Sequence, residues 1–256
     1  MHRREQILIS PERPALLVVA APKEALAVLG GIGGDRAASL RFHRWEAIRI
    51  IPGIELLMTG VGKACAAGAL ATVFDPTKHG AVINTGVAGL LPLSDGSDGS
   101  AGMLDVVLAD ASVYADEGIE TPDGFADVAS MGFSPAPPGF EAMGLTAPGD
   151  PWLLELLRPL TDHVGPIATV STCAGTDAIA QEVAARTGAI AEAMEGASVG
   201  FTTLCVSASR DVPAVPFVEA RVISNTTGDR TDQRWDLTGA LKRLRVFSER
   251  LPGALL

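Results

Sequence analysis

Short apolar runs, most of them followed by a helical pattern, are the feature that most constrains the fold of this chain. Residues 15–20 read Ala-Leu-Leu-Val-Val-Ala, and a helical pattern follows over residues 24–29. Similar runs predict further strands over residues 55–59, 81–84, 105–109, 167–170 and 217–223, and helices are expected over residues 63–74, 176–187, 195–207 and 232–250. Continuous apolar runs are typical of strands that are buried on both faces. The alternation therefore predicts an α/β protein with a mainly parallel sheet covered by helices on both sides.

One segment departs from this alternation. Residues 112–152 contain six prolines and several glycines. A chain of 256 residues suits one large α/β domain or two small ones. We predict a single domain over residues 1–256 with an irregular insertion around residues 112–152, and such long insertions often cover a functional site.

Charge and composition exclude several classes of function. The net charge of −10 argues against a nucleic-acid binder, whose affinity comes largely from neutralising phosphates. The three cysteines and four histidines show no metal-ligand spacing, so we expect no metal. No apolar stretch approaches the roughly 20 residues that span a bilayer. We expect a cytoplasmic protein that needs no cofactor and binds no membrane.

Three glycine-rich segments resemble phosphate-binding loops without matching one. Gly30–Gly34 is expected to end the first helix. Gly60-Val-Gly62-Lys63 lies between a strand and a helix but lacks both the P-loop spacing and GxGxxG, which leaves little support for a dinucleotide-dependent oxidoreductase. It is either a tight turn or a place where the backbone approaches a ligand. Residues 84–89, Asn-Thr-Gly-Val-Ala-Gly, are expected to form a loop that presents backbone N–H groups to a planar base.

Four segments along the chain occur in an order that resembles the nucleoside phosphorylase/nucleosidase superfamily. The resemblance rests on residues 20–24, 59–63, 84–89 and 193–197, the last followed by Arg221-Val-Ile-Ser-Asn225. It covers nearly the whole chain. It implies a three-layer α/β/α sandwich around a twisted mixed, mainly parallel sheet, and a homodimer or higher homo-oligomer.

Within the superfamily, the chain looks most like the futalosine hydrolases of menaquinone biosynthesis. Residues 223–236 carry an Ile-Ser-Asn, Gly-Asp-Arg and Trp-Asp arrangement, and residues 114–118 and 124–125 add support. The resemblance implies hydrolysis of the N-glycosidic bond of a purine nucleoside. Futalosine is the expected substrate and hypoxanthine the expected leaving base.

Two glutamates are the candidate catalytic carboxylates. Glu24 lies just past the first strand, and the resemblance implies that it activates water. On position alone it is more often a solvated glutamate in the first turn of a helix. The resemblance assigns Met194 and Glu195 to the ribose, where a carboxylate can accept both hydroxyls and favour the developing cation. The alternative for Glu195 is a glutamate that stabilises a helix dipole.

Asn225 is the candidate for recognition of the base. In the adenine-specific nucleosidases this position is Asp, whereas an amide can donate to O6 of hypoxanthine. The residue therefore favours a 6-oxopurine leaving group over methylthioadenosine. The alternative is an asparagine that caps a turn. Asp229 is predicted to supplement it in stabilising the leaving base.

The remaining candidates are expected to contact the substrate. The residues expected to contact the base are Val87, Ala88, Gly89, Cys173 and Ala174. Those expected to contact the benzoate of futalosine are Phe125, Tyr114 and Arg230. Trp235 is expected to lie near the site, without a more specific role. Structural packing or ion pairing remains an alternative for the aromatic residues and for Arg230.

The same scaffold supports three further functions. A 6-oxopurine nucleoside phosphorylase needs a cationic phosphate site, but residues 21–24 read Ala-Pro-Lys-Glu where such relatives carry a GDPxR-like loop. The second is a methylthioadenosine/S-adenosylhomocysteine-type nucleosidase, and the third is a nucleoside sensor without catalytic activity.

Overall fold

A twisted sheet forms the centre of the structure, a computed structural model that describes residues 9–34, 40–92 and 101–256. Within these residues, eleven strands form one sheet. They are β1 (Ala15–Val19), β2 (Ala47–Ile51), β3 (Ile54–Met58), β4 (Ala81–Leu90), β5 (Val106–Ala109), β6 (Ala111–Tyr114), β9 (Thr146–Pro148), β10 (His163–Val164), β11 (Ile167–Thr169), β12 (Ala191–Ala193) and β13 (Phe217–Thr226). Strands β7 (Gly118–Thr121) and β8 (Gly124–Asp127) form a separate hairpin.

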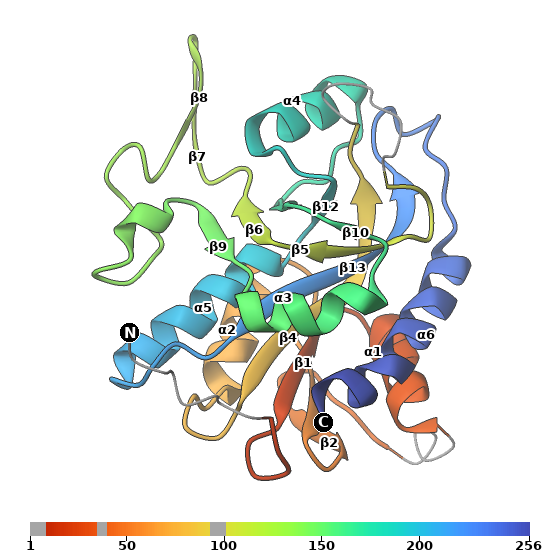
Figure 1. Ribbon diagram of the computed structural model, residues 1–256. Helices are drawn as coiled ribbons and strands as arrows, with labels where there is room; N and C mark the ends of the chain where they lie inside the picture. The colour runs from red at the N-terminus through yellow and green to blue at the C-terminus, as the bar shows by residue number, and fades with distance from the viewer. Residues whose placement is uncertain (1–8, 35–39, 93–100) are drawn as a thin grey trace.

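Helices cover both faces of the sheet, as the alternating pattern predicted (Figure 1). They are α1 (Pro22–Ile32), α2 (Lys63–Val73), α3 (Pro151–Leu157), α4 (Asp177–Thr187), α5 (Gly196–Ser209) and α6 (Leu237–Leu255). Helices α1 and α6 pack together over one face, and α2 and α5 pack over the other. The sheet is mixed and mainly parallel, and the predicted fold class is therefore confirmed. None of the described helices has the length and apolar composition needed to cross a bilayer.

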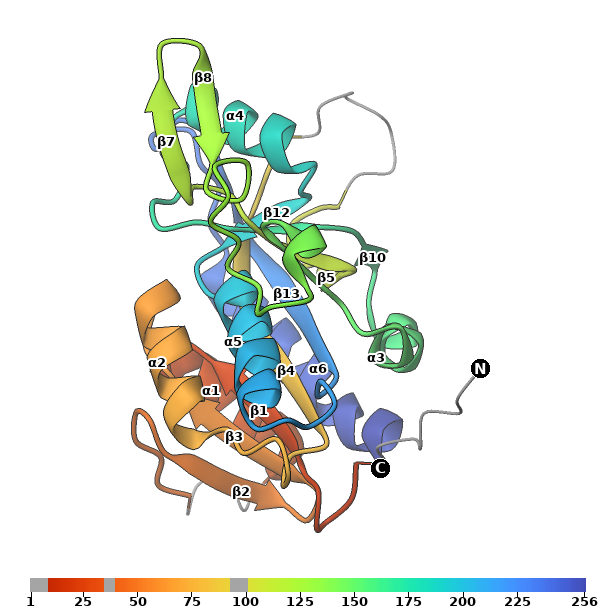
Figure 2. The same cartoon turned by 90° about the vertical axis from the view of Figure 1, so that its left-hand side faces the viewer.

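Strand β4 determines where a site can form, because its two halves have different neighbours. Its first half, up to Asn84, pairs in parallel with β1, whereas Gly89 and Leu90 pair antiparallel with β12. Strand β13 runs beside both halves, so β4 stays paired along its other edge (Figure 2). Between the carboxyl ends of β1 and β12, one edge of β4 is open. Ligands of open α/β sheets bind at such switch points.

Two strands extend further than the sequence indicated. Residues 85–89 were expected to form a loop, but they continue β4, and β13 likewise continues to Thr226. The prediction of a loop was wrong because these glycine-rich residues pair with β13, up to the pair Gly89 and Asn225. Gly89 thus presents its backbone from a strand. Strands β2 and β10 were not expected, whereas β12 lies directly before Met194 and Glu195, where a strand-to-helix junction was expected.

The helices agree more closely with expectation, except that α3 was not expected and the last helix begins late. Thr176 caps α4, since its Oγ1 accepts from the Ile179 N–H at 3.3 Å, and Gly188 ends the helix with φ 65°. The last helix begins at Leu237, five residues later than predicted. The start shifts because Arg234 and Asp236 pair back onto β13, after which the Asp236 carboxylate accepts from the Gly239 N–H at 2.7 Å.

The segment from 112 to 152 is more regular than expected. Its ends supply most of β6 and all of β9, which pair with each other in the main sheet. The hairpin of β7 and β8 lies between them and projects away from the sheet (Figure 1). A salt bridge from Lys63 of α2 to Glu117, at 2.9 Å, ties the start of this projection to the body of the protein.

Candidate active site

A buried network of charges lies at the switch point of the sheet. Its centre is Arg221 of β13, which is 1% exposed. Its Nε donates to Glu219 at 2.8 Å, and its Nη2 donates to Glu195 at 3.1 Å and to the side-chain oxygen of Asn84. Glu219 also accepts from the Ser112 hydroxyl at 2.6 Å. We call Glu24, Asn84, Glu195, Glu219 and Arg221 the Arg221 network.

Glu24 closes the open edge of β4. One carboxylate oxygen accepts from the Val87 N–H at 2.9 Å, and the other accepts from the N–H groups of Ala20 and Ala21 at 3.1 and 2.9 Å. A Cβ atom built on Gly86 would lie 2.3 Å from Glu24 Oε1 and 2.8 Å from Arg221 Nη1. The absence of a side chain at Gly86 thus lets the carboxylate approach the guanidinium.

Glu195 reaches the same network from the opposite side. It is the residue before α5 and is 3% exposed. One oxygen pairs with Arg221, and the other accepts from the Gly62 N–H at 2.9 Å. Gly62 has φ 96°, which favours glycine, so the predicted tight turn after β3 also brings its backbone to this carboxylate. The structure therefore brings the two predicted carboxylates together.

Burial perturbs the titration of the network. Burial raises the pKa of Glu24 and the pKa of Glu219, and nearby Arg221 partly offsets both effects. For Arg221, burial would lower the pKa, but Glu219, Glu195 and Glu24 raise it overall. The network holds three carboxylates around one guanidinium, which is the electrostatic setting that favours a cationic sugar.

A second group of residues surrounds Gly89. A Cβ atom on Gly89 would lie 3.1 Å from Nδ2 of Asn225 and 3.5 Å from Cγ of Glu192, so both side chains flank this glycine. Asn225 is 9% exposed; its oxygen accepts from the Ser224 hydroxyl, and its Nδ2 donates to the Thr226 carbonyl. The side chain of Glu192 accepts from the Ala174 N–H at 2.9 Å. Thr227 Cγ2 would lie closer still, at 2.9 Å, so the side chains of Asn225, Glu192 and Thr227 surround Gly89, and Glu192 links this group to Ala174.

Several predicted contact residues lie around this group. Val87 is the β4 residue whose N–H contacts Glu24, and Ala88 lies between Val87 and Gly89. Met194 is half-buried and packs against the core beneath α4. Cys173 lies on the turn before Ala174, where partial burial of the thiol, together with the nearby carboxylates of Glu192, Glu195 and Asp116, raises its pKa to about 11. A thiol with this pKa is not an activated nucleophile.

The loop after β13 carries the remaining predicted residues and is mostly exposed. The carboxylate of Asp229 accepts from the Asp177 N–H at 3.1 Å, and Asp177 accepts in return from the Asp229 N–H. Arg230 lies 4.9 Å from the ring centre of Trp235, which pairs with Asn225 through the backbone. Asp229 thus fastens the loop to the start of α4, and Trp235 lies beside the candidate base site.

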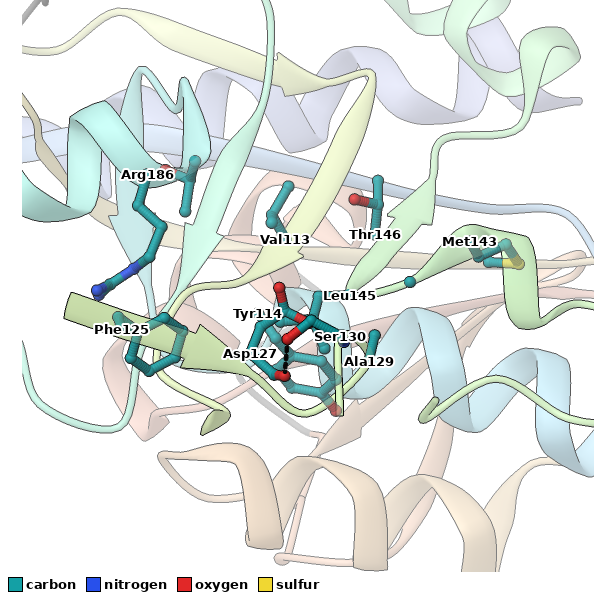
Figure 3. A pocket seen from close by; sticks show the side chains of 12 residues that line it. Val113, Tyr114, Phe125, Asp127, Ala129, Ser130, Met143, Leu145, Thr146 and Arg186 are labelled. Atoms are coloured by element: carbon teal, nitrogen blue, oxygen red, sulfur yellow. Dashed lines mark hydrogen bonds between the residues drawn. The ribbon is translucent and has the colours of Figure 1, made fainter. Parts of the chain in front are cut away.

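Phe125 lies elsewhere, at a cavity of about 470 Å³ between the β7–β8 hairpin, β9 and α4 (Figure 3). Arg186 covers its ring at 4.1 Å, and Tyr114 lines the same cavity. Lys63, the neighbour of Gly62, lies 5.1 Å from the ring centre of Tyr114. The cavity is therefore separate from the Arg221 network but linked to it through Tyr114 and Lys63.

The family of the chain follows from comparison with known proteins. A model of the phosphorylase superfamily matches residues 25–256, which is almost the whole chain. The chain belongs to the phosphorylase superfamily. The match begins directly after Glu24, so the comparison says nothing of that residue.

Relatives in this superfamily agree with the observed fold. A protein named futalosine hydrolase from Acidothermus cellulolyticus is 36% identical, over 90% of this chain and 86% of its own. The solved futalosine hydrolase of Helicobacter pylori superposes with a TM-score of 0.64 at 17% identity, covering 95% and 97% of the two chains. A methylthioadenosine/S-adenosylhomocysteine nucleosidase from Colwellia psychrerythraea, solved with adenine, superposes with a TM-score of 0.67 at 19% identity, covering 97% and 98%. At these identities the two structures show the shared fold of the superfamily alone.

Three residues of the site were not singled out from the sequence. Glu219 and Arg221 stand two residues apart in the otherwise apolar first part of β13, so they share one face. Opposite charges at that spacing in a buried strand were a usable signal of an ion pair. Glu192 lies in the three-residue strand β12, which is too short to show a pattern. Among the described residues, no group of three or more acidic, histidine or cysteine side chains is arranged to hold a metal ion.

Proposed function

We propose that this protein hydrolyses the N-glycosidic bond of futalosine, releasing hypoxanthine and dehypoxanthine futalosine in menaquinone biosynthesis. The observation that carries the proposal is the convergence of Glu24 and Glu195 on Arg221 at the switch point of the sheet. The relative from Acidothermus, named futalosine hydrolase, supports the choice of substrate. We expect the protein to act in the cytoplasm.

The proposed reaction uses the two carboxylates differently. The bond between C1′ and N9 breaks, and its electron pair leaves with the purine, which takes up a proton. Glu195 binds the ribose hydroxyls and stabilises the cationic sugar. Water then adds to C1′ while Glu24 accepts its proton. The raised pKa of Glu24 brings the carboxylate closer to the working pH, as a general base requires.

Water is preferred to phosphate as the acceptor because of the charges at the site. In the described part of the chain, the one cation of the Arg221 network is Arg221, which already pairs with Glu195 and Glu219. A phosphate ion would meet three carboxylates there. This arrangement favours a hydrolase over a phosphorylase.

The substitution Glu24→Gln tests the proposal. It keeps the size of the side chain but removes the base, so kcat for futalosine should fall by roughly 10²–10⁴-fold while binding persists. The assay follows free hypoxanthine without phosphate, with inosine and methylthioadenosine as comparison substrates. Glu12→Gln, at an exposed turn, is the matched control.

Three results would contradict the proposal. Turnover that requires phosphate and releases a sugar 1-phosphate would identify a phosphorylase. Release of adenine from methylthioadenosine with futalosine untouched would overturn the substrate. Binding of nucleosides by the wild-type protein with no release of base would indicate a sensor.

A further inference from the structure

One fully buried carboxylate of the Arg221 network has no role in the proposed mechanism. Glu219 of β13 is 0% exposed. Its oxygens accept from Arg221 Nε at 2.8 Å and from the Ser112 hydroxyl at 2.6 Å. Burial of a carboxylate costs free energy that such partners must offset. Because both oxygens are bonded and solvent does not reach them, the charge of Glu219 acts within the network rather than on a substrate.

Glu219 fixes the orientation of Arg221. While Nε is paired with Glu219, Nη2 donates to Glu195 at 3.1 Å and to the side-chain oxygen of Asn84. The guanidinium is planar, so these bonds also set the direction of the third nitrogen, Nη1. Nη1 makes a long contact with the Val87 carbonyl, at 3.5 Å. Among the described residues, it is the least engaged nitrogen of the group.

Glu24 lies beside Nη1 but does not pair with it. A Cβ atom built on Gly86 would lie 2.3 Å from Glu24 Oε1 and 2.8 Å from Arg221 Nη1, so this glycine lies against both groups. Within the described part of the chain, the ion pairs of Arg221 are those with Glu195 and Glu219. A small movement of the guanidinium would therefore bring Nη1 onto the carboxylate of Glu24.

An ion pair between Arg221 and Glu24 would weaken the proposed base. A cation beside a carboxylate lowers its pKa, and a carboxylate with a lower pKa accepts a proton from water less readily. Burial raises the pKa of Glu24, and the charged groups that act on it are Arg221 from β13 and Glu195 from the residue before α5. The end of β1, the start of α1 and β4 contribute backbone N–H groups. The strength of the base thus depends on how closely Arg221 approaches.

We propose that Glu219 is a positioning residue that holds Arg221 towards Glu195 and away from Glu24, which leaves Glu24 free to accept a proton from water. This inference rests on the proposed function, because it takes Glu24 to be the base. Glu219 itself touches no reacting atom. The role explains why a fully buried part of β13 carries a carboxylate two residues before an arginine.

The test is the pH dependence of kcat/KM for futalosine in Glu219→Gln. The amide keeps the shape, accepts from Arg221 Nε and can donate to the Ser112 oxygen, so the variant loses mainly the charge. Arg221 should then move towards Glu24. The acid limb of the profile, where Glu24 takes up a proton, should move to lower pH by about 0.5–1 pH unit, and kcat should fall about tenfold. Glu249→Gln, an exposed carboxylate on α6, should change neither.

Ser112→Ala tests the same point without replacing Glu219. The hydroxyl favours the ionised form of Glu219, so its loss raises the pKa of that carboxyl. Glu219 then takes up a proton earlier as the pH falls and releases Arg221, so we expect a smaller movement of the acid limb in the same direction. This variant carries the test if Glu219→Gln does not fold. An acid limb at the wild-type pH with activity merely reduced would overturn the proposal, because a purely structural role predicts that pattern.

A measurement without substrate keeps this test independent of the proposed reaction. Carbon-13 NMR of the glutamate carboxyl groups gives the pKa of Glu24 directly, and Glu24→Gln identifies its signal. We expect the pKa of Glu24 to be lower in Glu219→Gln than in the wild type. An unchanged pKa would refute the role of Glu219 whatever the protein cleaves. A lower pKa in a protein that does not cleave futalosine would support the positioning of Arg221 and refute only the proposed reaction.

Discussion

At the scale of single residues, two glycines leave the space that carboxylates of the Arg221 network occupy. A Cβ atom on Gly196 would lie 1.9 Å from Glu219 Oε2, so any side chain there must displace the partner of Arg221. Gly86 has the same relation to Glu24. The Arg221 network is thus possible because the backbone around it carries no side chains.

Gly196→Ala tests this dependence. The added methyl group must push Glu219 away from Arg221 and Ser112, so the free energy of unfolding should fall by about 1–3 kcal/mol. Denaturant unfolding measures the change. Gly253→Ala, in α6 with no atom within 4 Å of the added carbon, should be neutral or stabilise by up to about 1 kcal/mol. Equal stability of the two variants would show that the network adapts without cost.

The sequence identified the candidate catalytic residues of the site better than the residues that hold them in position. Glu24, Glu195 and Asn225 follow strands in recognisable segments, and the structure brings them to one end of the sheet. Arg221 and Glu219 were not predicted because their meaning depends on which strand lies beside β13. Their spacing indicates an ion pair, but the order of the strands, which brings that pair to the site, is a tertiary property that no local pattern encodes.

At the scale of elements, burial decided which strands were predictable. The central strands β1 and β4 begin with fully apolar runs that a sequence pattern detects. Strand β12 reads Ala-Glu-Ala, so its central glutamate interrupts the apolar pattern of a buried strand. It forms a strand because it pairs with β4. The start of α6 was misjudged because long-range pairing of Arg234 and Asp236 with β13 competes with helix formation.

Helix α4 and the loop after β13 offer different cations for the benzoate of futalosine. Arg186 lies over Phe125 at the cavity, whereas Arg230 lies over Trp235 near the base site. Because the benzoate is attached to the sugar rather than to the purine, we expect Arg186→Ala to raise KM for futalosine about tenfold. Arg230→Ala should have the smaller effect.

Steady-state kinetics with inosine, which lacks the benzoate, supplies the control. If each arginine acts only by binding the carboxylate of the benzoate, both variants should turn over inosine at the same rate as the wild type. A larger KM effect of Arg230→Ala on futalosine would assign the benzoate to the loop after β13, as the sequence had suggested. Loss of inosine turnover in either variant would indicate a structural role.

At the scale of the whole molecule, the insertion leaves apolar surface uncovered. Ile119, Met131, Phe133 and Phe140 are exposed large apolar side chains between β6 and β9, and Phe133 is 71% exposed. Large exposed apolar side chains in one segment are typical of interfaces. We infer that a second copy of the chain covers this side, in line with the homo-oligomer that the family resemblance implies.

We therefore expect Phe133→Ser to shift a dimer towards monomer in light scattering at micromolar concentration. Val246→Ser, on α6 across the sheet, should leave the mass unchanged, and a monomeric wild-type protein would refute the inference (Figure 1).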